Sequence, residues 1–234
     1  MTTLSATPIG RVLITGGGSG LGAAVAEIVT LAGGSAIVLD RDISRVSGSS
    51  AFEVDVSDTR ATESAVREIA RSFDGLDAVV TAAGIDRCGR LEDVPAEEWE
   101  RVIRVNLLGT VAVIRAALPF LTDSHGRVVT VASSLALRAV ADATAYCASK
   151  FGVLGFSRAL AAETRGEIGV TTLIPSGMRT RFFDDRDEQY KPADDSMLND
   201  PATVANAVLF ALGQPRGSEV RELVICHERE PSWP

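Results

Sequence analysis

A tyrosine and a lysine in the second half of the chain have the types and the spacing to move a proton. Tyr146 and Lys150 stand four residues apart, and on a helix this spacing places both side chains on one face. A free phenol, with a pKa of about 10, is a poor base at neutral pH, but a cation held beside it favours the phenolate and lowers that pKa. The pair therefore predicts acid–base chemistry, although a YxxxK spacing taken alone is more often a surface tyrosine beside a solvated lysine.

A glycine-rich turn near the start of the chain has the composition to hold a phosphate. Glycine lets the backbone turn sharply and approach a ligand, and the start of a helix directs unpaired N–H groups and a positive dipole end at an anion. A pyrophosphate fits this description, although glycines also end strands for purely local reasons. The candidate contact residues, between an apolar run and an alanine-rich segment, are Gly16, Ser19, Gly20, Leu21 and Gly22.

An acidic residue after the next apolar run makes the phosphate interpretation more specific. Asp40 stands eighteen residues after Gly22, close to where a dinucleotide-binding fold places the carboxylate that contacts the adenosine ribose. Such a carboxylate accepts hydrogen bonds from the ribose hydroxyls and repels a 2′-phosphate, which predicts NAD as the cofactor in preference to NADP. Arg41 follows immediately and could swing toward a 2′-phosphate, so NADP stays as the alternative.

Short apolar runs alternate with longer segments of helical periodicity. The runs, rich in Val and Ile as is typical of a parallel sheet covered on both faces, are Arg11–Thr15, Ser35–Asp40, Leu76–Thr81, Arg127–Ala132, Val170–Ile174 and Arg221–Cys226. The helical segments are Gly20–Ala32, Asp58–Phe73, Pro95–Leu121, Thr144–Thr164 and Pro201–Leu212. This alternation predicts an α/β fold with a doubly wound parallel sheet of the Rossmann kind, and 234 residues suit one domain spanning 1–234.

Two helix starts and two connections carry further predictions. Asp58 is a candidate N-cap, and Pro201 after Asp200 suits the first turn of a helix. The connection Arg41–Ser50 is short and rich in serine, which predicts a loop in place of a crossover helix. The segment Arg181–Asn199 is acidic and has little apolar periodicity, which predicts an exposed and mobile segment.

Composition argues against several classes of protein. The net charge of −8 disfavours binding to a phosphate backbone, and two histidines without paired spacing predict no metal site. Three cysteines, far apart and without CxxC spacing, predict reduced thiols. No uncharged apolar run is long enough to span a membrane, and Met1–Gly10 lacks the pattern of a secretory signal, so we expect a soluble, cytoplasmic protein.

The motifs together closely resemble those of the short-chain dehydrogenase/reductase family, in its compact single-domain branch, from about Arg11 onward. The YxxxK pair is matched by Tyr146 and Lys150 in the expected order after the glycine motif. The family's catalytic serine lies thirteen residues before the tyrosine, which selects Ser133 over Ser134. The family's TGxxxGxG motif and its NxxG motif are matched by Thr15, Gly16, Gly20, Gly22, Asn106 and Gly109.

The resemblance implies an NAD(P)-dependent oxidoreductase that interconverts a secondary alcohol and a ketone by hydride transfer. Lys150 would bind the nicotinamide ribose and lower the pKa of Tyr146, which would exchange the proton with the substrate. Ser133 would donate a hydrogen bond to the substrate oxygen, and Asn106 would anchor a water that links Lys150 to solvent.

The resemblance also implies further contacts to the cofactor. Asp55 would contact the adenine, with Val56 behind the ring, and Thr180 would hold the nicotinamide carboxamide. Ala83 and Gly84 would border the adenosine ribose. The cofactor-binding set is completed by Ala82, Pro175 and Gly177, together with Tyr146 and Lys150.

The chain departs from the family pattern at two turns. Thr81 replaces the usual asparagine after the fourth strand, and its hydroxyl can still bond a neighbouring backbone group. Ser176 separates Pro175 from Gly177, which slightly alters the turn beside the nicotinamide pocket.

Charged loops near the substrate pocket leave two alternatives open. The acidic residues between Asp184 and Asp195 lie where relatives carry the lid over the substrate, and they could face a cationic substrate or only solvent. Arg87 and Arg90 could face a substrate carboxylate or, equally, solvent.

The resemblance implies a homodimer or homotetramer and leaves two rival functions. Two apolar helices, around Leu107–Ile114 and Phe151–Phe156, would pair across the subunit interface. An NADPH-dependent carbonyl reductase is one rival, against which Asp40 argues. The other is a sensor or scaffold protein that binds a dinucleotide without turnover, which need not retain the whole catalytic set.

Overall fold

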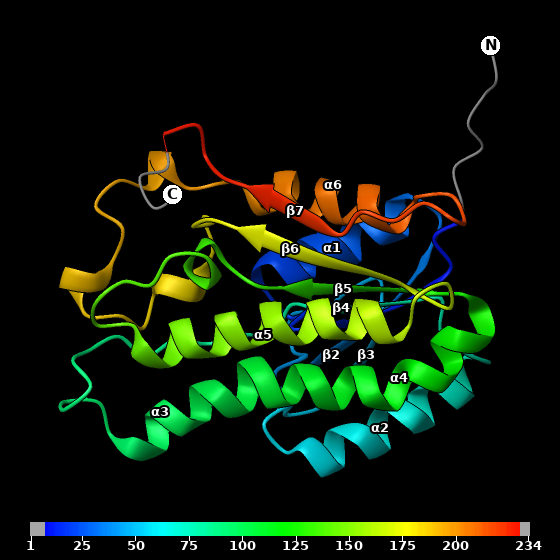
Figure 1. Ribbon diagram of the computed structural model, residues 1–234, viewed down its shortest axis with the longest axis horizontal. Helices are drawn as coiled ribbons and strands as arrows, with labels where there is room; N and C mark the ends of the chain where they lie inside the picture. The colour runs from blue at the N-terminus through cyan, green and yellow to red at the C-terminus, as the bar shows by residue number, and fades with distance from the viewer. Residues whose placement is uncertain (1–7, 230–234) are drawn as a thin grey trace.

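Residues 8–229 of this computed structural model form one seven-stranded parallel sheet with helices on both faces (Figure 1). The expectation that the chain lacks a secretory signal rests largely on Met1–Thr7, which lies outside the described residues. The strands are β1 (Arg11–Thr15), β2 (Ser35–Asp40), β3 (Ser50–Glu53), β4 (Ala78–Thr81), β5 (Arg127–Val131), β6 (Gly169–Pro175) and β7 (Glu222–Ile225).

The strand order is β3-β2-β1-β4-β5-β6-β7, which confirms the predicted doubly wound Rossmann topology. The order reverses beside β1, and in sheets of this topology ligands bind in a crevice outside the carboxyl ends of the strands at the reversal, here β1 and β4. Six strands match the predicted runs within two residues at each end. The strand Ser50–Glu53 was absent from the predicted runs, because it lies at the sheet edge and none of its residues is fully buried.

Six α-helices lie in the connections between the described strands, and the two predicted helix starts are confirmed. Asp58 accepts hydrogen bonds from Arg60 N and Ala61 N, and Asp200 accepts one from Ala202 N beside the first-turn proline. The helices are α1 (Gly20–Leu31), α2 (Thr59–Ser72), α3 (Ala96–Ile103), α4 (Thr110–Ser124), α5 (Thr144–Glu163) and α6 (Pro201–Leu212). Between α3 and α4 the chain forms a π-helical turn, η1 (Arg104–Gly109), within one continuous helical segment.

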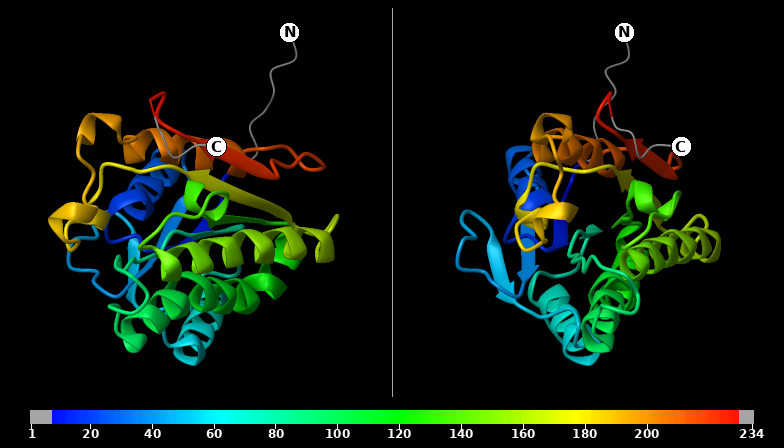
Figure 2. Two further views of the ribbon diagram at one scale, coloured as in Figure 1. Left: turned by 60° about the vertical axis from the view of Figure 1, so that its left-hand side comes forward. Right: turned by 90° about the vertical axis from the view of Figure 1, so that its left-hand side faces the viewer.

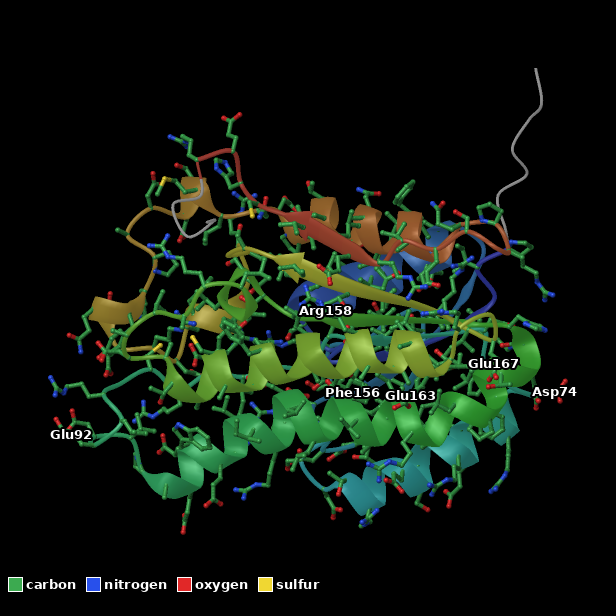
Figure 3. The ribbon with its side chains drawn as sticks, in the orientation of Figure 1. Asp74, Glu92, Phe156, Arg158, Glu163 and Glu167 are labelled. Carbon is green, nitrogen blue, oxygen red and sulfur yellow. The ribbon has the colours of Figure 1, made fainter. Side chains whose placement is uncertain are left out.

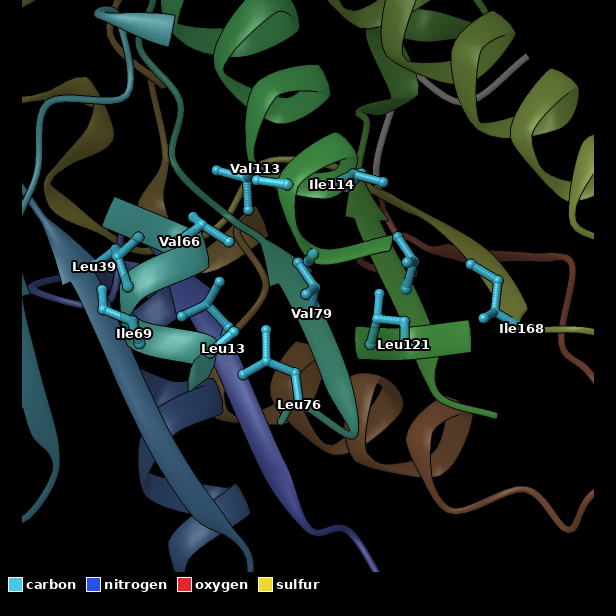
Figure 4. Packing of buried hydrophobic residues seen from close by; sticks show 14 of the residues in the cluster. Leu13, Leu39, Val66, Ile69, Leu76, Val79, Val113, Ile114, Leu121 and Ile168 are labelled. Carbon is cyan, nitrogen blue, oxygen red and sulfur yellow. The ribbon is translucent and has the colours of Figure 1, made fainter. Parts of the chain in front are cut away.

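The core lies in two layers because alternate residues of each strand face opposite sides of the sheet. Leu13 of β1 packs with Val66 and Val113 on the side of α2, α4 and α5 (Figure 4). Its neighbours Val12 and Ile14 pack on the side of α1 and α6. Figure 2 shows the same separation of the helices from two further directions.

The helical segment Ala96–Ser124 is long and apolar enough to cross a membrane by length and composition alone. In this protein 56% of its apolar window is buried against the rest of the chain. Its inner face includes Val113, Ile114 and Leu121, which are 0% exposed and belong to the core cluster. Packing inside the protein therefore accounts for its hydrophobicity.

The two connections that were predicted to be irregular, residues 41–49 and 181–199, differ in structure. Residues 41–49 contain no helix, as predicted from their composition. The 181–199 segment contains three short 3-10 helices, and its ends are joined by a bridge between Met178 and Asn199. In Figure 1 the first two of these short helices lie beyond the arrowhead of β6, near the start of α5, and the third lies farther along the chain, toward α6. The segment is thus a closed loop over the carboxyl edge of the sheet.

Candidate active site

The glycine turn after β1 is built so closely that side chains cannot replace its glycines. Gly16 has a left-handed backbone (φ 71°), and a Cβ there would lie 2.7 Å from the backbone nitrogen of Ala83. A Cβ on Gly22 would lie 2.2 Å from the carbonyl oxygen of Gly16. Ser19 is the N-cap of α1 but its side chain makes no capping bond, so the N–H groups at this helix start face outward without a side-chain partner.

Asp40 at the end of β2 supports this turn. Its Oδ2 accepts a hydrogen bond from Gly18 N at 2.8 Å, and its Oδ1 accepts one from Asp42 N at 3.1 Å. An ionised carboxylate has about four acceptor positions, so two remain for ribose hydroxyls. The neighbouring Arg41 is exposed.

Asp55 and Val56 lie after β3 on the same edge of the sheet. Asp55 Oδ1 accepts a hydrogen bond from Ser57 N at 2.9 Å, and this bond lowers the pKa of the carboxyl. Val56 is 7% exposed and packs against the π-helical turn, where a Cβ on Gly109 would lie 2.8 Å from the carbonyl oxygen of Val56. The structure therefore places both residues near the glycine turn, with Val56 turned into the core.

The Ala82–Gly84 turn after β4 closes the other side of the crevice. Ala83 N donates to Thr15 Oγ1 at 3.2 Å, which ties this turn to the end of β1. We expected the hydroxyl of Thr81 to bond a backbone group. That expectation is wrong, because Thr81 Oγ1 is buried without a hydrogen-bond partner in the described part of the chain.

Ser133, Tyr146 and Lys150 come together at the carboxyl end of β5. The Tyr146 hydroxyl is hydrogen-bonded to Ser133, and Lys150 Nζ lies 5.6 Å from the centre of the Tyr146 ring. Lys150 is 5% exposed, and its Nζ donates to the carbonyl oxygen of Val131 at 2.8 Å. Ser134 is also buried, but Ser133 is the serine that meets the phenol.

The acidity of this pair differs from the sequence-based expectation. We expected Lys150 to lower the pKa of Tyr146, but burial raises it to about 12, and the hydrogen bond from Ser133 only partly opposes this change. Burial also lowers the pKa of Lys150 to about 8. Removing both groups from water disfavours the charged form of each. A further positive charge at this edge would lower the pKa of the phenol toward neutral pH.

Asn106 in the π-helical turn fastens the loop after β4 to α5. Its Oδ1 accepts from Ile85 N at 2.8 Å, while its Nδ2 donates to Ile85 O at 2.9 Å and to Ser149 Oγ at 3.0 Å. A Cβ on Gly84 would lie 3.5 Å from Asn106 Oδ1 and 3.6 Å from Lys150 Nζ. The amide therefore holds Gly84 beside the lysine. Sequence reasoning missed Ser149, which is 0% exposed and joins this network.

Thr180 faces the glycine turn from the far side of the crevice. A Cβ on Gly20 would lie 3.4 Å from the Thr180 side chain, and Thr180 Oγ1 accepts from Phe182 N at 3.3 Å. Pro175 is the last residue of β6, and the turn at Gly177 is fixed because its carbonyl oxygen accepts from Asn199 N at 2.9 Å. All three predicted residues thus lie on the same edge as the glycines.

The charged loops around the site are paired with one another. Arg87 forms an ion pair with Glu98, and Arg90 forms one with Glu92 at 2.9 Å. In Figure 3, Glu92 lies at the same end of the molecule as the start of α5, while Glu163 and Glu167 mark the opposite end. The 181–199 segment also contributes Arg186, which forms a half-buried ion pair with Asp86. Sequence reasoning missed this pair.

The residues at this edge fit a dinucleotide. The glycine turn is a cradle that added methyl groups would fill, the start of α1 has no side-chain cap, and Asp40 keeps acceptor positions free. Thr180, Lys150 and Gly84 border the other end of the same crevice. The arrangement can bind a pyrophosphate at one end and hold a proton-transfer group at the other.

Comparisons with known proteins agree with this geometry. The family model described as short chain dehydrogenase matches residues 10–191. A D-threitol dehydrogenase of Mycolicibacterium smegmatis is 32% identical over 183 residues, which are 73% of this chain and 70% of that protein.

Two solved structures share the whole fold. An alcohol dehydrogenase of Thermococcus sibiricus complexed with 5-hydroxy-NADP has a TM-score of 0.84 at 25% identity, covering 93% of this chain and 96% of that one. A 3-ketoacyl-(acyl-carrier-protein) reductase of Brucella melitensis complexed with NADH has a TM-score of 0.83 at 27% identity, covering 94% and 98%. The protein is therefore an oxidoreductase that belongs to the short-chain dehydrogenase/reductase family.

Proposed function

We propose that this protein interconverts a secondary alcohol and a ketone, with NAD as the preferred cofactor. The observation that carries the proposal is the meeting of Ser133, Tyr146 and Lys150 at the edge that also holds the glycine turn. A bound nicotinamide dinucleotide would supply the hydride donor or acceptor and, in its oxidised form, a positive charge beside the phenol.

The chain's own residues would move the proton and orient the substrate. Tyr146 accepts the proton of the alcohol during oxidation and returns it to the carbonyl oxygen during reduction. Ser133, already bonded to the phenol, is placed to donate a hydrogen bond to the same substrate oxygen. Lys150 is held in place by its bond to Val131 O, where its pKa of about 8 leaves it cationic at neutral pH.

Asn106 acts in this proposal as the residue that keeps the site assembled. Its three side-chain hydrogen bonds reach Ile85 and Ser149, which belong to two different elements. The anchoring of a water by Asn106, implied by the family resemblance, remains part of the proposal. The main-chain oxygen of Asn106 already accepts from Thr110 Oγ1 at 2.8 Å, which leaves it one further lone pair.

We infer that the substrate is uncharged. The arginines that could have met a substrate carboxylate, Arg87 and Arg90, are engaged by glutamates. Two acidic residues of the 181–199 segment that could have met a cation are paired as well, Asp184 with Arg181 and Glu188 with Lys191. The aromatic ring of Phe182 lies 5.7 Å from that of Tyr146 and offers an apolar wall.

The preference for NAD rests on Asp40. Its remaining acceptor positions suit ribose hydroxyls, and its negative charge opposes a 2′-phosphate. An NADPH-dependent carbonyl reductase is the rival, favoured by the exposed Arg41 and by the NADP analogue in the Thermococcus neighbour. A catalytic efficiency that is higher with NADP(H) than with NAD(H) would favour the rival.

The test is an absorbance screen for reduction of NAD and NADP over uncharged alcohols, including D-threitol, sugars, hydroxysteroids and small secondary alcohols. Tyr146→Phe serves as the matched control, because it removes only the hydroxyl. We expect this variant to bind cofactor with unchanged affinity by calorimetry and to lose turnover by about a hundredfold or more. Near-normal turnover in this variant would refute the role of the phenol, and cofactor binding without turnover on any substrate would favour the sensor or scaffold alternative.

We further propose that the protein works in the cytoplasm as one domain in a homodimer or homotetramer. Leu108 and Phe151, on the two helices expected at the interface, are 44% and 45% exposed, which supports an interface there. Val113, Ile114 and Leu154 of the predicted interface face the core instead. Cys88, Cys147 and Cys226 form no disulfide within the described residues, which suits a reducing compartment.

A further inference from the structure

Asp86 and Arg186 form an ion pair between two loops that are far apart in the chain. Asp86 lies two residues after Gly84, and Arg186 lies in the middle of the 181–199 segment. Arg186 Nη2 donates to Asp86 Oδ2 at 2.6 Å, and the two side chains are 18% and 3% exposed. The Asp86 carboxylate is almost removed from water while the Arg186 guanidinium stays partly exposed, so the carboxylate depends on this partner for its compensation.

Each side chain of this half-buried pair has further partners in its own loop. Asp86 also accepts from Arg87 N at 2.7 Å and from the Cys88 thiol at 3.3 Å. Arg186 also donates from Nη1 to the carbonyl oxygen of Tyr190 at 3.2 Å. Each charge is therefore fixed by its own loop as well as by its partner.

The guanidinium of Arg186 is connected to the catalytic tyrosine through aromatic rings. Its central carbon lies 4.6 Å from the centre of the Phe183 ring and 5.2 Å from that of Phe182. The Phe182 ring lies 5.7 Å from the ring of Tyr146. The segment that carries Arg186 is thus in contact with the proton-transfer residue, and Asp86 anchors that contact from the opposite loop.

The two charges act on Tyr146 in opposite directions. The negative charge of Asp86 raises the pKa of the phenol, and the positive charge of Arg186 lowers it. The remaining polar groups that face the phenol are Ser133 after β5 and, on α5 itself, Lys150 and Cys147. Asp86 also raises the pKa of Lys150. Asp86 without Arg186 would therefore place an uncompensated carboxylate beside both proton-transfer groups.

We propose that Asp86 and Arg186 are positioning residues of the reaction: the 181–199 segment brings Arg186 onto Asp86 and cancels the charge of this carboxylate beside the Tyr146 hydroxyl. The inference rests on the proposed role of Tyr146 as the proton-transfer group. The proposal links the position of the 181–199 segment to the pKa of the Tyr146 hydroxyl. A loop that lifts away would expose Asp86 to water and leave Tyr146 without the compensating cation.

The chain offers a direct readout of this acidity, because it contains only two tyrosines, Tyr146 and Tyr190. In a Tyr190→Phe background, biosynthetic incorporation of a fluorinated tyrosine labels position 146 alone, and the lower pKa of a fluorinated phenol brings its titration into the range where the protein stays folded. Fluorine nuclear magnetic resonance then follows the titration of the full chain without any substrate. Four further variants form the test: Asp86→Asn, Arg186→Gln, the double variant and Arg186→Lys.

We expect the two single neutralisations to move the titration in opposite directions. Asp86→Asn leaves the cation of Arg186 and lowers the pKa at position 146 by about one unit, while Arg186→Gln leaves the carboxylate and raises it by a similar amount. The double variant removes both charges and returns close to the reference. Arg186→Lys keeps the charge and stays near the reference, which a loss of packing alone would not predict.

Shifts of the same sign in both single variants, or no shift in either, would overturn the inference. If Arg186→Gln fails to fold by circular dichroism, Asp86→Asn and the double variant still decide, because neither leaves a carboxylate buried without its partner.

The proposed function is tested separately through Tyr146→Phe. Lost turnover in that variant together with an unmoved fluorotyrosine titration would overturn this inference and leave the proposed function standing. Retained turnover would refute the function whatever the titration shows.

Discussion

The glycine turn after β1 and the 181–199 segment face each other across the crevice, and they are held by different kinds of interaction. The turn is fixed by main-chain contacts so close that a Cβ on Gly22 would lie 2.2 Å from a carbonyl oxygen. The segment is fixed at its base by the main-chain bond between Gly177 and Asn199 and by the Asn199 side chain, and above its base by the Asp86–Arg186 pair. The first region therefore tolerates almost no added atom, while the second depends on a few particular side chains and leaves the rest of its residues free to vary.

This difference suits the two ligands that the proposed function requires. A pyrophosphate is the same in every reaction of a dinucleotide enzyme, so a rigid main-chain cradle serves it. A substrate pocket must be shaped for one compound, and a loop whose side chains set its position can be altered without disturbing the sheet. We therefore expect substitutions in the glycine turn to change the affinity for the cofactor, and substitutions in the 181–199 segment to change KM for the alcohol.

The largest effect is expected from Gly22→Ala in the glycine turn. The added methyl group must displace the backbone of Gly16, so the turn opens and α1 shifts relative to β1. We expect affinity for NAD, measured by calorimetry, to fall by about a hundredfold, together with a lower melting temperature.

Gly155→Ala is the matched control for this substitution. Gly155 lies inside α5, and an added Cβ would meet nothing within 4 Å. Because glycine costs a helix interior more conformational entropy than alanine, this variant should gain roughly 0.5–1 kcal/mol in the free energy of unfolding of a single subunit. Gly155 lies on the helix proposed for the subunit interface, so the two variants are compared in the same oligomeric state, checked by gel filtration. Unchanged NAD affinity in Gly22→Ala would show that the turn is more adaptable than its contacts indicate, and would remove the contrast between the two regions.

The same contrast explains how much the sequence predicted. The glycines and the Tyr146–Lys150 spacing are local patterns whose geometry is dictated by the backbone, so the crevice and most of its residues could be placed in advance. The Asp86–Arg186 pair is two charged residues in loops, a hundred positions apart, and each taken alone is typical of an exposed surface. The acidic residues around Arg186 predicted an exposed segment, and nothing in their pattern indicated that this arginine is half-buried against Asp86.

Two other failures have physical causes of the same kind. The edge strand Ser50–Glu53 has no continuous apolar run because its residues are only partly buried. The raised pKa of Tyr146 follows from burial of the hydroxyl, and burial depends on the packing of several elements that no local spacing reveals.

A second, smaller effect is expected from Asp40→Asn. The asparagine keeps an acceptor for Gly18 N but loses the charge that repels a 2′-phosphate and strengthens the bonds to ribose hydroxyls. We expect the ratio of catalytic efficiencies for NAD and NADP to fall by about tenfold or more. A companion variant, Arg41→Ala, should leave the efficiency with NAD unchanged, and a fall in NAD efficiency there would show that the arginine contacts the cofactor.

Asn199→Ala tests how the base of the 181–199 segment is held. Asn199 Nδ2 donates to Ser176 Oγ at 3.0 Å, and the residue is 8% exposed. Its loss loosens the base of the segment without touching the glycine turn. We expect KM for the alcohol to rise about fivefold and the segment to be cleaved faster in limited proteolysis, while NAD affinity stays within about twofold. An equal loss of NAD affinity would mean that the two regions are not independent.

The smallest effect is expected from Lys191→Ala, which removes an ion pair from the same segment. Lys191 Nζ contacts Glu188 Oε1 at 2.6 Å, but the Glu188 side chain is 89% exposed, so water and salt replace the contact at little cost. We expect KM and the proteolysis rate to stay within about twofold of the wild type at physiological salt. Because this bond is as short as the one between Arg186 and Asp86, the two pairs differ mainly in burial. A Lys191→Ala effect as large as that of Arg186→Gln would mean that burial does not decide which side chains hold the segment, and that its many exposed charges act together.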